Sequence, residues 1–419
     1  MSSPPQPGLE RKIGPLQATA INMTQMCGIG PFVTIPAMVA TLGGPQAVFG
    51  WLIGAIIALA DGLIWAELGA ALPGAGGTYV YLREAFGSRT GRLMPFLFAW
   101  SAVLFIPLIM STGIIGLVQY LGYLIPGVAD EGGTTGLGKV IGLGVIVLVV
   151  LAAFRRIGEI GKLTTVLFAI MLFAALSVIV APFTRFDGAQ AFAFTPGAFS
   201  FGGGAFWAGL GAGLIIAIYD YLGYNTSAYL GGEVRDPGRT LPRSIIFSIL
   251  GITSLYFLLQ LGVLGSIPLE ELKSATSVAS TVLEQAWGTG AAKVITVFIV
   301  IAAIGSLFTL TAVINAAVTV LVLVQSLAQV AAIVVLRRRR PELDRPYRQW
   351  LYPIPTIIAL LGWVYIYFSA TWLSIGLSVG WIALGVAAFL TYAKAERVWP
   401  FGPKGIQESF AGAAEGNGK

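Results

Sequence analysis

The sequence contains no histidine, one cysteine and few charged residues. Histidine is the most common metal ligand and titrates near neutral pH, so its absence argues against a metal centre and a histidine proton relay. The lone cysteine, Cys27, excludes an internal disulfide. Ser-His and paired-cysteine arrangements are excluded for the same reason, and no two carboxylates stand at a fixed catalytic spacing. We therefore expect neither an enzyme nor a bound metal or cofactor.

Charged residues make up 11% of the 419 residues, and hydrophobic residues make up 56%. The mean hydropathy is +0.84, and a soluble protein of this size needs more polar surface than such a composition supplies. The net charge of +6 comes from basic residues that collect in short connections beside apolar runs. That distribution is typical of membrane topology signals. The sequence predicts an integral membrane protein that contacts the lipid bilayer and binds no nucleic acid.

Long apolar runs dominate the chain, and lipid offers their backbone no hydrogen-bonding partner outside a helix. A spanning helix needs roughly 20 residues, so the chain has room for about ten to twelve helices and no catalytic domain outside the membrane. We therefore predict an all-α polytopic membrane protein. The runs cover residues 15–42, 46–71, 93–124, 139–154, 163–182, 205–231, 244–267, 291–336, 354–369 and 372–392.

Basic residues mark every second connection between these runs, and acidic residues mark the alternate ones. The basic connections should be cytoplasmic by the positive-inside rule. We expect a multi-pass protein of the bacterial inner membrane, without a signal peptide and with cytoplasmic tails at 1–12 and 398–419. The basic residues are Arg11, Lys12, Arg83, Arg89, Arg92, Arg155, Arg156, Lys162, Arg235, Arg239 and Arg243, and the acidic ones are Asp130, Glu131, Glu270 and Glu271.

The run 291–336 conflicts with this charge pattern. Its 46 residues measure about 69 Å as a helix, enough for two crossings of a roughly 30 Å hydrocarbon core. Two crossings would place the four arginines at 337–340 outside, against the charge rule. Either one crossing is joined by a segment that lies flat, re-enters or forms an incomplete helix, or the C-terminal part is inverted. We predict ten full crossings rather than eleven, with these arginines in the cytoplasm.

The first run is interrupted at Cys27-Gly28-Ile29-Gly30-Pro31. Two glycines and a proline make a continuous helix costly, and Pro31 removes a backbone donor. Unwound backbone inside a membrane is tolerated where it lines a cavity, and the amides that open the second half-helix form a positive end suited to a carboxylate. A proline kink that only permits close helix packing is the alternative explanation.

The sixth run contains a second interruption, Tyr219-Asp220-Tyr221-Leu222-Gly223. A carboxyl group at that depth is energetically expensive and usually faces a cavity. Asp220 is a candidate to pair with a substrate amine, to relay protons or to hydrogen-bond across helices as a structural group. Interruptions in the first and sixth spans are typical of transporters built from inverted five-helix repeats.

Two further acids lie in the second run. Glu67 falls near its cytoplasmic edge, where a gating carboxylate or one that fixes a loop is more expected than a substrate ligand. Asp61 lies about 9 Å deeper, at 1.5 Å per residue. It is either a coupling group or a polar contact between helices.

Three segments occur together in this chain. They are the Gly-Ile-Gly break in the first run, AELGAALPGAGGTYVYLREAFG at 66–87 and GEVRDPGRTLPR at 232–243. In combination they resemble the bacterial amino acid permeases of the amino acid–polyamine–organocation (APC) superfamily. The resemblance runs from residue 12 to about 311, resumes through the arginine-rich segment ending at Arg348 and fades after Val398.

The resemblance implies an APC-type bundle of five-plus-five inverted repeats followed by two extra helices, with discontinuous helices one and six. The transporter domain would span 13–397, with a first repeat at 13–182, an incomplete second repeat at 205–336 and two extra helices at 353–393. The repeat is incomplete because the family's ninth-helix region is missing between Thr311 and Ala312, so about one helix is absent.

The family's functional residues carry over to both breaks. The stretch whose free amides hold the substrate carboxylate matches Cys27, Gly28, Ile29 and Gly30. The break whose carbonyls receive the amine and whose side chains shape the pocket matches Tyr219, Asp220, Tyr221, Leu222 and Gly223. Residues considered for coupling or gating are Asp61, Glu67, Glu233, Ser306 and Thr309, the last two because the eighth helix helps to form the ion site of sodium-coupled relatives.

Two departures from the family pattern concern the first break and the coupling mechanism. Family members commonly read Ser-Gly-Ile-Phe at the first break, whereas residues 29–32 read Ile-Gly-Pro-Phe and lack that hydroxyl. The lysine that many proton-coupled or exchanging relatives carry in the fifth helix aligns here with Met171. Coupling through that lysine is therefore not expected, and coupling to protons or to sodium stays open.

The resemblance implies a secondary active transporter that moves an amino acid or related amine across the plasma membrane by alternating access. The alternative is a non-transporting or inactive amino-acid-binding member of the same family, because the missing region disturbs the second repeat. A passive channel is disfavoured, since two discontinuous helices replace a repeated filter. The amino acid and the oligomeric state stay open.

Overall fold

The computed structural model describes residues 11–130, 133–153, 160–275, 277–312, 322–396 and 398. Helices occupy all ten predicted apolar runs, and a two-residue antiparallel pair, in which Ala129 faces Thr134, is the sole sheet among these residues. The helices of the first half are α1 (Pro15–Met26), α2 (Gly30–Leu42), α3 (Ala47–Ala71), α4 (Thr78–Thr90), α5 (Leu93–Leu124), α6 (Gly136–Ala153), α7 (Ile160–Phe183) and α8 (Gly188–Ala191), with strands β1 (Ala129–Asp130) and β2 (Gly133–Thr134).

The second half contains the other helices. They are α9 (Gly204–Tyr221), α10 (Thr226–Tyr229), the 3-10 helix η1 (Gly231–Glu233), α11 (Pro237–Leu264), α12 (Leu269–Ser274), α13 (Val278–Trp287), α14 (Thr289–Ala312), the π-helix η2 (Val322–Leu327), α16 (Ala328–Arg339), α17 (Ile354–Ser369) and α18 (Trp372–Ala395).

Within the described residues, five helices are long and apolar enough to cross a membrane: α3, α5, α7, α11 and α18. The pair α1 and α2 gives a sixth candidate span, bent by 46° at a short break. Shorter apolar helices lie in α6, α9, α14 and α17. These ten apolar elements follow the ten predicted runs, and the number that cross the bilayer completely stays a prediction.

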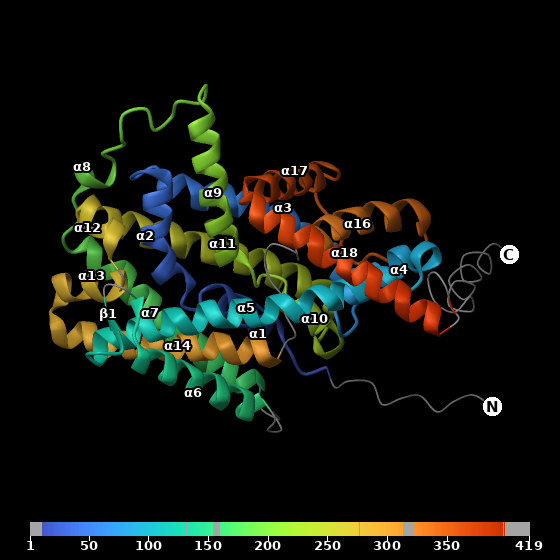
Figure 1. The fold of residues 1–419 in the computed structure, drawn as a ribbon, viewed down its shortest axis with the longest axis horizontal. Helices are drawn as coiled ribbons and strands as arrows, with labels where there is room; N and C mark the ends of the chain where they lie inside the picture. Colours follow the sequence, from blue (N-terminus) through green and yellow to red (C-terminus); the bar gives the residue numbers. More distant parts are fainter. Residues whose placement is uncertain are drawn as a thin grey trace.

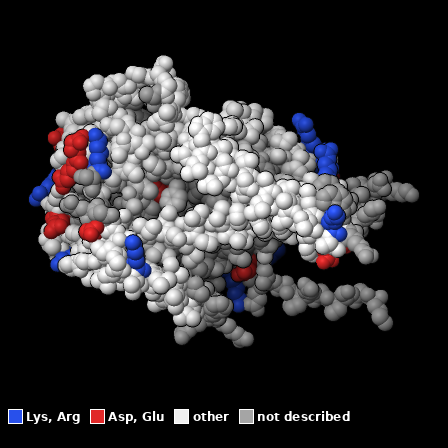
Figure 2. Space-filling model, in the orientation of Figure 1, with Lys and Arg blue, Asp and Glu red and all other residues white. Residues whose placement is uncertain are grey.

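Charged side chains mark two ends of the molecule. Figure 1 shows α4 and α16 at one end, here the α4 end, and α8, α12, α13 and β1 at the other, here the α12 end. Figure 2 shows that acidic and basic side chains gather toward these two ends, while the surface between them in this view is largely uncharged. An uncharged belt between charged ends is the arrangement that a bilayer requires.

Helix α3 forms the centre of the bundle. Of its most apolar 18-residue window, 72% is buried, compared with 22% for α18 at the periphery. Helix α11 packs along α3, and α1 packs against α11 and α7. Because α3 is enclosed by other helices, its two acids, Asp61 and Glu67, are 0% and 1% exposed.

The described part of the run 291–336 contains α14, the π-helix η2 and α16. Helix α14 covers 24 residues, about 36 Å, whereas α16 has 12 residues and packs against α4 at the α4 end. Arg340 pairs with Glu84 of α4 at 3.1 Å, so the arginines lie beside the basic connection after α3. Helix η2 runs directly into α16, so this helical segment covers residues 322–339. Residues 313–321, between α14 and η2, lie outside the described part, and the number of crossings in this run stays a prediction.

Candidate functional site

The first break separates α1 from α2 at residues 27–29. The amide of Cys27 donates to the carbonyl oxygen of Met23 at 2.8 Å, which closes the last turn of α1. In this structure the Cys27 amide is therefore engaged at the C-terminal end of α1, and its part in holding a substrate carboxylate stays a prediction. Helix α2 begins at Gly30, and Pro31 has no N–H to donate. The first-turn amides of α2 have no partner within the helix, and they form the positive end of its dipole.

The second break follows Tyr221, where α9 ends. Leu222 is extended (φ −62°, ψ 132°), and Gly223 has a φ of +126°, which a residue with a side chain rarely adopts. A Cβ at Gly223 would lie 2.6 Å from Cγ of Gln25 and 3.1 Å from the backbone nitrogen of Met26. The second break therefore packs directly on the end of α1.

A tyrosine of α11 joins the two breaks. The hydroxyl of Tyr256 contacts the carbonyl oxygen of Met26 at 2.7 Å and that of Asp220 at 3.0 Å. Met26 is the last residue of α1, and Asp220 lies in the last turn of α9. One buried hydroxyl thus lies within hydrogen-bond distance of carbonyls at both interruptions and shares its single proton between them.

The carboxylate of Asp220 faces the start of α2. One of its oxygens, Oδ2, accepts a hydrogen bond from the Thr34 hydroxyl, which is also 3.0 Å from the carbonyl oxygen of Gly30. The other oxygen, Oδ1, lies 2.1 Å from where a Cβ of Gly30 would be. Asp220 is 2% exposed, and Oδ1 is buried without a hydrogen-bond partner among the described residues. A buried acceptor that lacks a donor is a place where a ligand N–H gains binding energy.

The arrangement offers complementary groups to a small zwitterion. The positive end of α2 suits a carboxylate, and the unpartnered oxygen of Asp220 suits an ammonium group. Gly30 allows the two helices to approach, because any side chain there would collide with Asp220. The structure thus brings Gly30 of the first break and Asp220 of the second break together.

The other predicted residues of the second break have different surroundings. The hydroxyl of Tyr219 is 2.5 Å from that of Thr112 in α5. The hydroxyl of Tyr221 contacts Trp51 O and Thr253 Oγ1, both at 3.2 Å. Tyr221 therefore contacts α3 and α11, and its part in substrate binding stays a prediction. Leu222 is half-buried at the end of α9.

Asp61 lies in a separate buried contact. Its carboxylate accepts from the Tyr224 hydroxyl at 2.6 Å and from the Trp363 indole at 3.0 Å. Tyr224 belongs to the second break, and Trp363 belongs to α17. Asp61 therefore joins α3, the sixth-helix break and one of the two C-terminal helices, which is the polar contact between helices considered from the sequence.

Glu67 fixes the segment after α16. It forms a two-pronged ion pair with Arg337, lies 3.7 Å from Nε of Arg345 and accepts from the amide of Gln349 at 2.8 Å. Burial, and next the charge of Glu67, raises the pKa of the Tyr347 hydroxyl in this segment to about 12. The carboxylate therefore holds α16 and residues 345–349 at the α4 end.

The described contacts assign no side-chain role to the remaining coupling or gating candidates, Glu233, Ser306 and Thr309. Glu233 makes backbone contacts: its carbonyl oxygen accepts a hydrogen bond from the amide of Ile13 at 3.0 Å. Ser306 and Thr309 fall in α14, but their side chains lie outside the described part of the chain. The role of both in ion binding stays a prediction.

Sequence reasoning missed Tyr256 and Thr34, which make the contacts that connect the breaks. Tyr256 interrupts a strongly apolar run, and such a polar-tipped ring inside a span was the available signal. Thr34 stands four residues after Gly30, one helical turn from the break. Neither signal indicates which residue Tyr256 or Thr34 contacts, because each contact joins residues far apart in the sequence.

The fold and site define an all-α, multi-pass membrane protein with two interrupted helices that meet at their breaks. Residues 13–322 match the family described as Amino acid permease. The chain belongs to this family, as the resemblance to bacterial amino acid permeases of the APC superfamily predicted. Helices α16, α17 and α18 follow the matched region.

Three relatives show how far the similarity extends. The serine/threonine exchanger SteT of Bacillus subtilis is 32% identical over 307 residues, covering 72% of this chain and 65% of SteT. The aspartate-proton symporter of Bacillus subtilis is 29% identical, over 56% of this chain and 44% of its own length. The branched-chain amino acid permease BcaP of Lactococcus lactis is 28% identical, over 58% and 54%. The chain thus matches less than two thirds of the length of each.

Proposed function

We propose that this protein is a secondary transporter of amino acids that works by alternating access. The family, the interrupted first and sixth spans and the names of three transporting relatives support this proposal. The α-carboxylate binds at the start of α2, and the α-ammonium group binds between Asp220 and the carbonyls of the second break.

The observation that carries the proposal is the contact of the Tyr256 hydroxyl with carbonyl oxygens at both breaks. A ligand bound between the breaks would touch two half-helices from different repeats at once. Alternating access in such folds is a movement of one helix group against another around a fixed site. A site shared by both repeats is therefore able to couple binding to that movement.

Asp220 is the coupling group in this proposal, and the coupling ion is the proton. Its carboxylate lies where substrate and helix α2 meet, and removing its charge changes the local attraction for an ammonium group. The relatives include one protein named a proton symporter and one named an exchanger. Transport in this chain would occur across the bacterial plasma membrane, with the α4 end in the cytoplasm.

Reconstitution tests the proposal directly. Purified protein in proteoliposomes is assayed for uptake of each of the twenty radiolabelled amino acids, with and without an inward proton gradient. Thermal stabilisation by the same amino acids is measured in parallel. Uptake above protein-free liposomes for at least one of them is expected. Stabilisation without uptake would instead identify the non-transporting binder, and neither signal across all twenty amino acids contradicts the proposal.

A further inference from the structure

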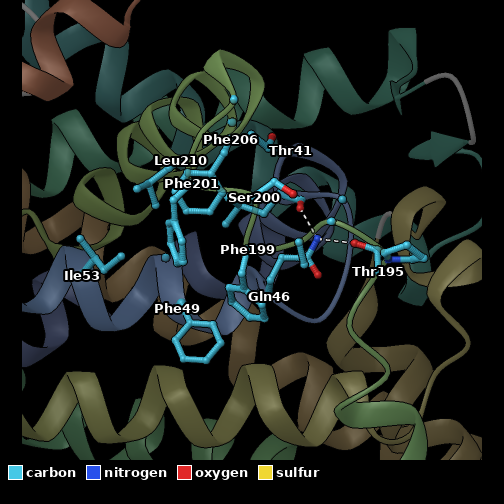
Figure 3. Close-up of a pocket in the computed structure, with 18 residues that line it drawn as sticks. Thr41, Gln46, Phe49, Ile53, Thr195, Phe199, Ser200, Phe201, Phe206 and Leu210 are labelled. Atoms are coloured by element: carbon cyan, nitrogen blue, oxygen red, sulfur yellow. Dashed lines mark hydrogen bonds between the residues drawn. The ribbon is translucent and has the colours of Figure 1, made fainter.

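Two cavities that lie away from the breaks differ in charge. One, of about 530 Å³, lies between the end of α2, the start of α3 and the segment that leads into α9, and none of its lining residues is charged (Figure 3). The other, of about 220 Å³, lies between the start of α1 and the start of α11. This second cavity, here the basic pocket, is lined by Pro15, Arg235, Asp236, Arg239, Thr240 and Arg243.

Positive charge exceeds negative charge in the basic pocket. Three arginines and one aspartate line it, and Arg239 and Arg243 stand four residues apart on one face of α11. Arg239 and Asp236 are 3.9 Å apart, and both side chains are largely exposed, so this pair neutralises little of the surplus. A guanidinium group binds two phosphate oxygens at once through parallel hydrogen bonds. The lining of the basic pocket therefore favours a phosphate group.

Hydrogen bonds hold the two walls of the basic pocket together. The amide of Ile13 donates to the carbonyl oxygen of Glu233 at 3.0 Å, and the amide of Arg235 donates to the carbonyl oxygen of Ile13 at 2.9 Å. The Thr240 hydroxyl donates to the carbonyl oxygen of Arg235 at 2.7 Å, and Nε of Arg235 is 3.2 Å from the carbonyl oxygen of Arg11. The start of α1 and the segment before α11 are thus joined, and Arg235 extends from a fixed backbone.

The basic pocket lies where α11 leaves the hydrocarbon core. The 28 residues of α11 measure about 42 Å, compared with roughly 30 Å for the core, so the first turn extends among the lipid headgroups. Arg239 belongs to that turn, and the side chain of Arg243, one turn deeper, is tilted back toward it. Exposed apolar residues follow at once: Phe247 and Leu250 of α11 are 61% and 47% exposed, and Leu16 of α1 is 70% exposed. A phosphate in the basic pocket would therefore have room for acyl chains directly below it.

From these features we propose that the basic pocket binds the phosphate of an anionic phospholipid, whose acyl chains lie along Phe247 and Leu250. A zwitterionic lipid has the same phosphate but also carries a cationic group, which the surplus of arginine charge repels. A lipid with a net negative charge is therefore preferred. The bound phosphate bridges the start of α1 and the start of α11. The basic pocket shares no residue with the two breaks, so the proposal does not depend on amino acid transport.

Photoactivatable lipids test the proposal on the full-length protein in phosphatidylcholine nanodiscs. A phosphatidylglycerol probe and a phosphatidylcholine probe carry the same diazirine near the glycerol end of one acyl chain, and the labelled peptides are identified by mass spectrometry. The phosphatidylglycerol probe should label residues 15–16 and 244–250 about tenfold more strongly than the phosphatidylcholine probe. Each basic residue near an anionic headgroup strengthens binding about fivefold, so two or three arginines suffice for that ratio.

Matched double variants separate the basic pocket from the general charge of this end of the molecule. Arg239→Gln combined with Arg243→Gln should lower labelling by the phosphatidylglycerol probe about tenfold and leave labelling by the phosphatidylcholine probe unchanged. Arg89→Gln combined with Arg92→Gln is the control, because it removes the same charge from exposed positions at the end of α4 and the start of α5, outside the basic pocket. The control should leave both probes unchanged.

A further arm separates a lipid phosphate from a free one. Inorganic phosphate is added at millimolar concentration, and chloride at equal ionic strength serves as the reference for charge screening. Phosphate should reduce labelling by the phosphatidylglycerol probe no more than chloride does, because it lacks the acyl chains that hold the lipid against α11.

Three results overturn the proposal. Equal labelling of residues 244–250 by the two probes in the unmodified protein shows contact with bulk lipid only. Equal effects of the two double variants assign the preference to the overall charge of this end. Displacement by inorganic phosphate beyond that by chloride assigns the basic pocket to a soluble anion. The first comparison uses the unmodified protein, so it decides the question even if a variant does not fold.

Discussion

Asp220 and Gly30 lie so close together that a Cβ on residue 30 would be 2.1 Å from Oδ1 of Asp220. The acid comes from the end of α9 and the glycine from the start of α2. The contact places the carboxylate of one interrupted helix against the positive end of the other. It explains why residue 30 has no side chain, because any Cβ there would collide with that carboxylate.

Replacing Gly30 tests that contact. Gly30→Leu should abolish amino acid binding and uptake, because the side chain needs the space that Asp220 and the ligand occupy. The matched control is Gly144→Leu, since Gly144 is an exposed position on α6 where a Cβ meets no atom within 4 Å. Binding is measured by thermal shift on protein recovered from the membrane. Undiminished binding by a folded Gly30→Leu protein places the substrate elsewhere.

The two deep acids should differ in their effect on transport. Asp220→Asn should abolish uptake or remove its dependence on pH, because the substituted group cannot change charge. Asp61→Asn should retain the pH profile but lower stability by roughly 1–3 kcal/mol, since an amide cannot accept equally well from Tyr224 and Trp363. Uptake is measured between pH 5 and 8. If both variants match the parent at every pH, both acids serve packing alone.

The hydroxyl that joins the breaks is tested by Tyr256→Phe. Loss of its contacts with Met26 and Asp220 should lower uptake at least fivefold, because the two breaks are no longer held together, while the ring keeps its packing. Tyr367→Phe is the control, since that buried hydroxyl contacts Ser378 at 2.9 Å, away from the site. Equal uptake by the two variants would show that the bridge has no functional role.

The buried ion pair at the α4 end is tested by a double-mutant cycle on Glu67 and Arg337. Arg337→Met should destabilise the protein by roughly 3 kcal/mol, because it leaves the Glu67 carboxylate without its main partner. The combination with Glu67→Gln should cost less than the sum of the single changes. Additive costs in thermal unfolding would indicate that the pair contributes no coupling energy.

The sidedness of the molecule is tested by cysteine labelling after Cys27→Ser. Single cysteines replace Asp344, exposed beside the arginines of the α4 end, and Glu270, exposed at the α12 end. An impermeant thiol reagent applied to intact cells should label residue 270 and not residue 344 until the cells are opened. Labelling of residue 344 from outside would establish the inverted C-terminal part and contradict the prediction of ten crossings.

Local features of the sequence predicted the helices and both interruptions. Apolar runs longer than a bilayer is thick have few alternatives to helix, and glycine, proline and a buried acid mark a break wherever they occur. The positive-inside rule predicted that the arginines at 337–340 are cytoplasmic. The structure places Arg340 beside Glu84 of α4. None of these signals depends on a partner elsewhere in the chain.

Tertiary structure decided which groups meet. Nothing in the sequence near Asp220 indicates that Thr34 and Gly30 are its neighbours, and nothing near Asp61 indicates that Trp363 of α17 donates to it. The contacts of Tyr256 are likewise products of packing between distant helices. The sequence by itself determined the membrane-embedded helices and where two of them break, because those depend on local composition and the solvent. Only the three-dimensional packing decided which polar groups are paired and which are left open to a ligand.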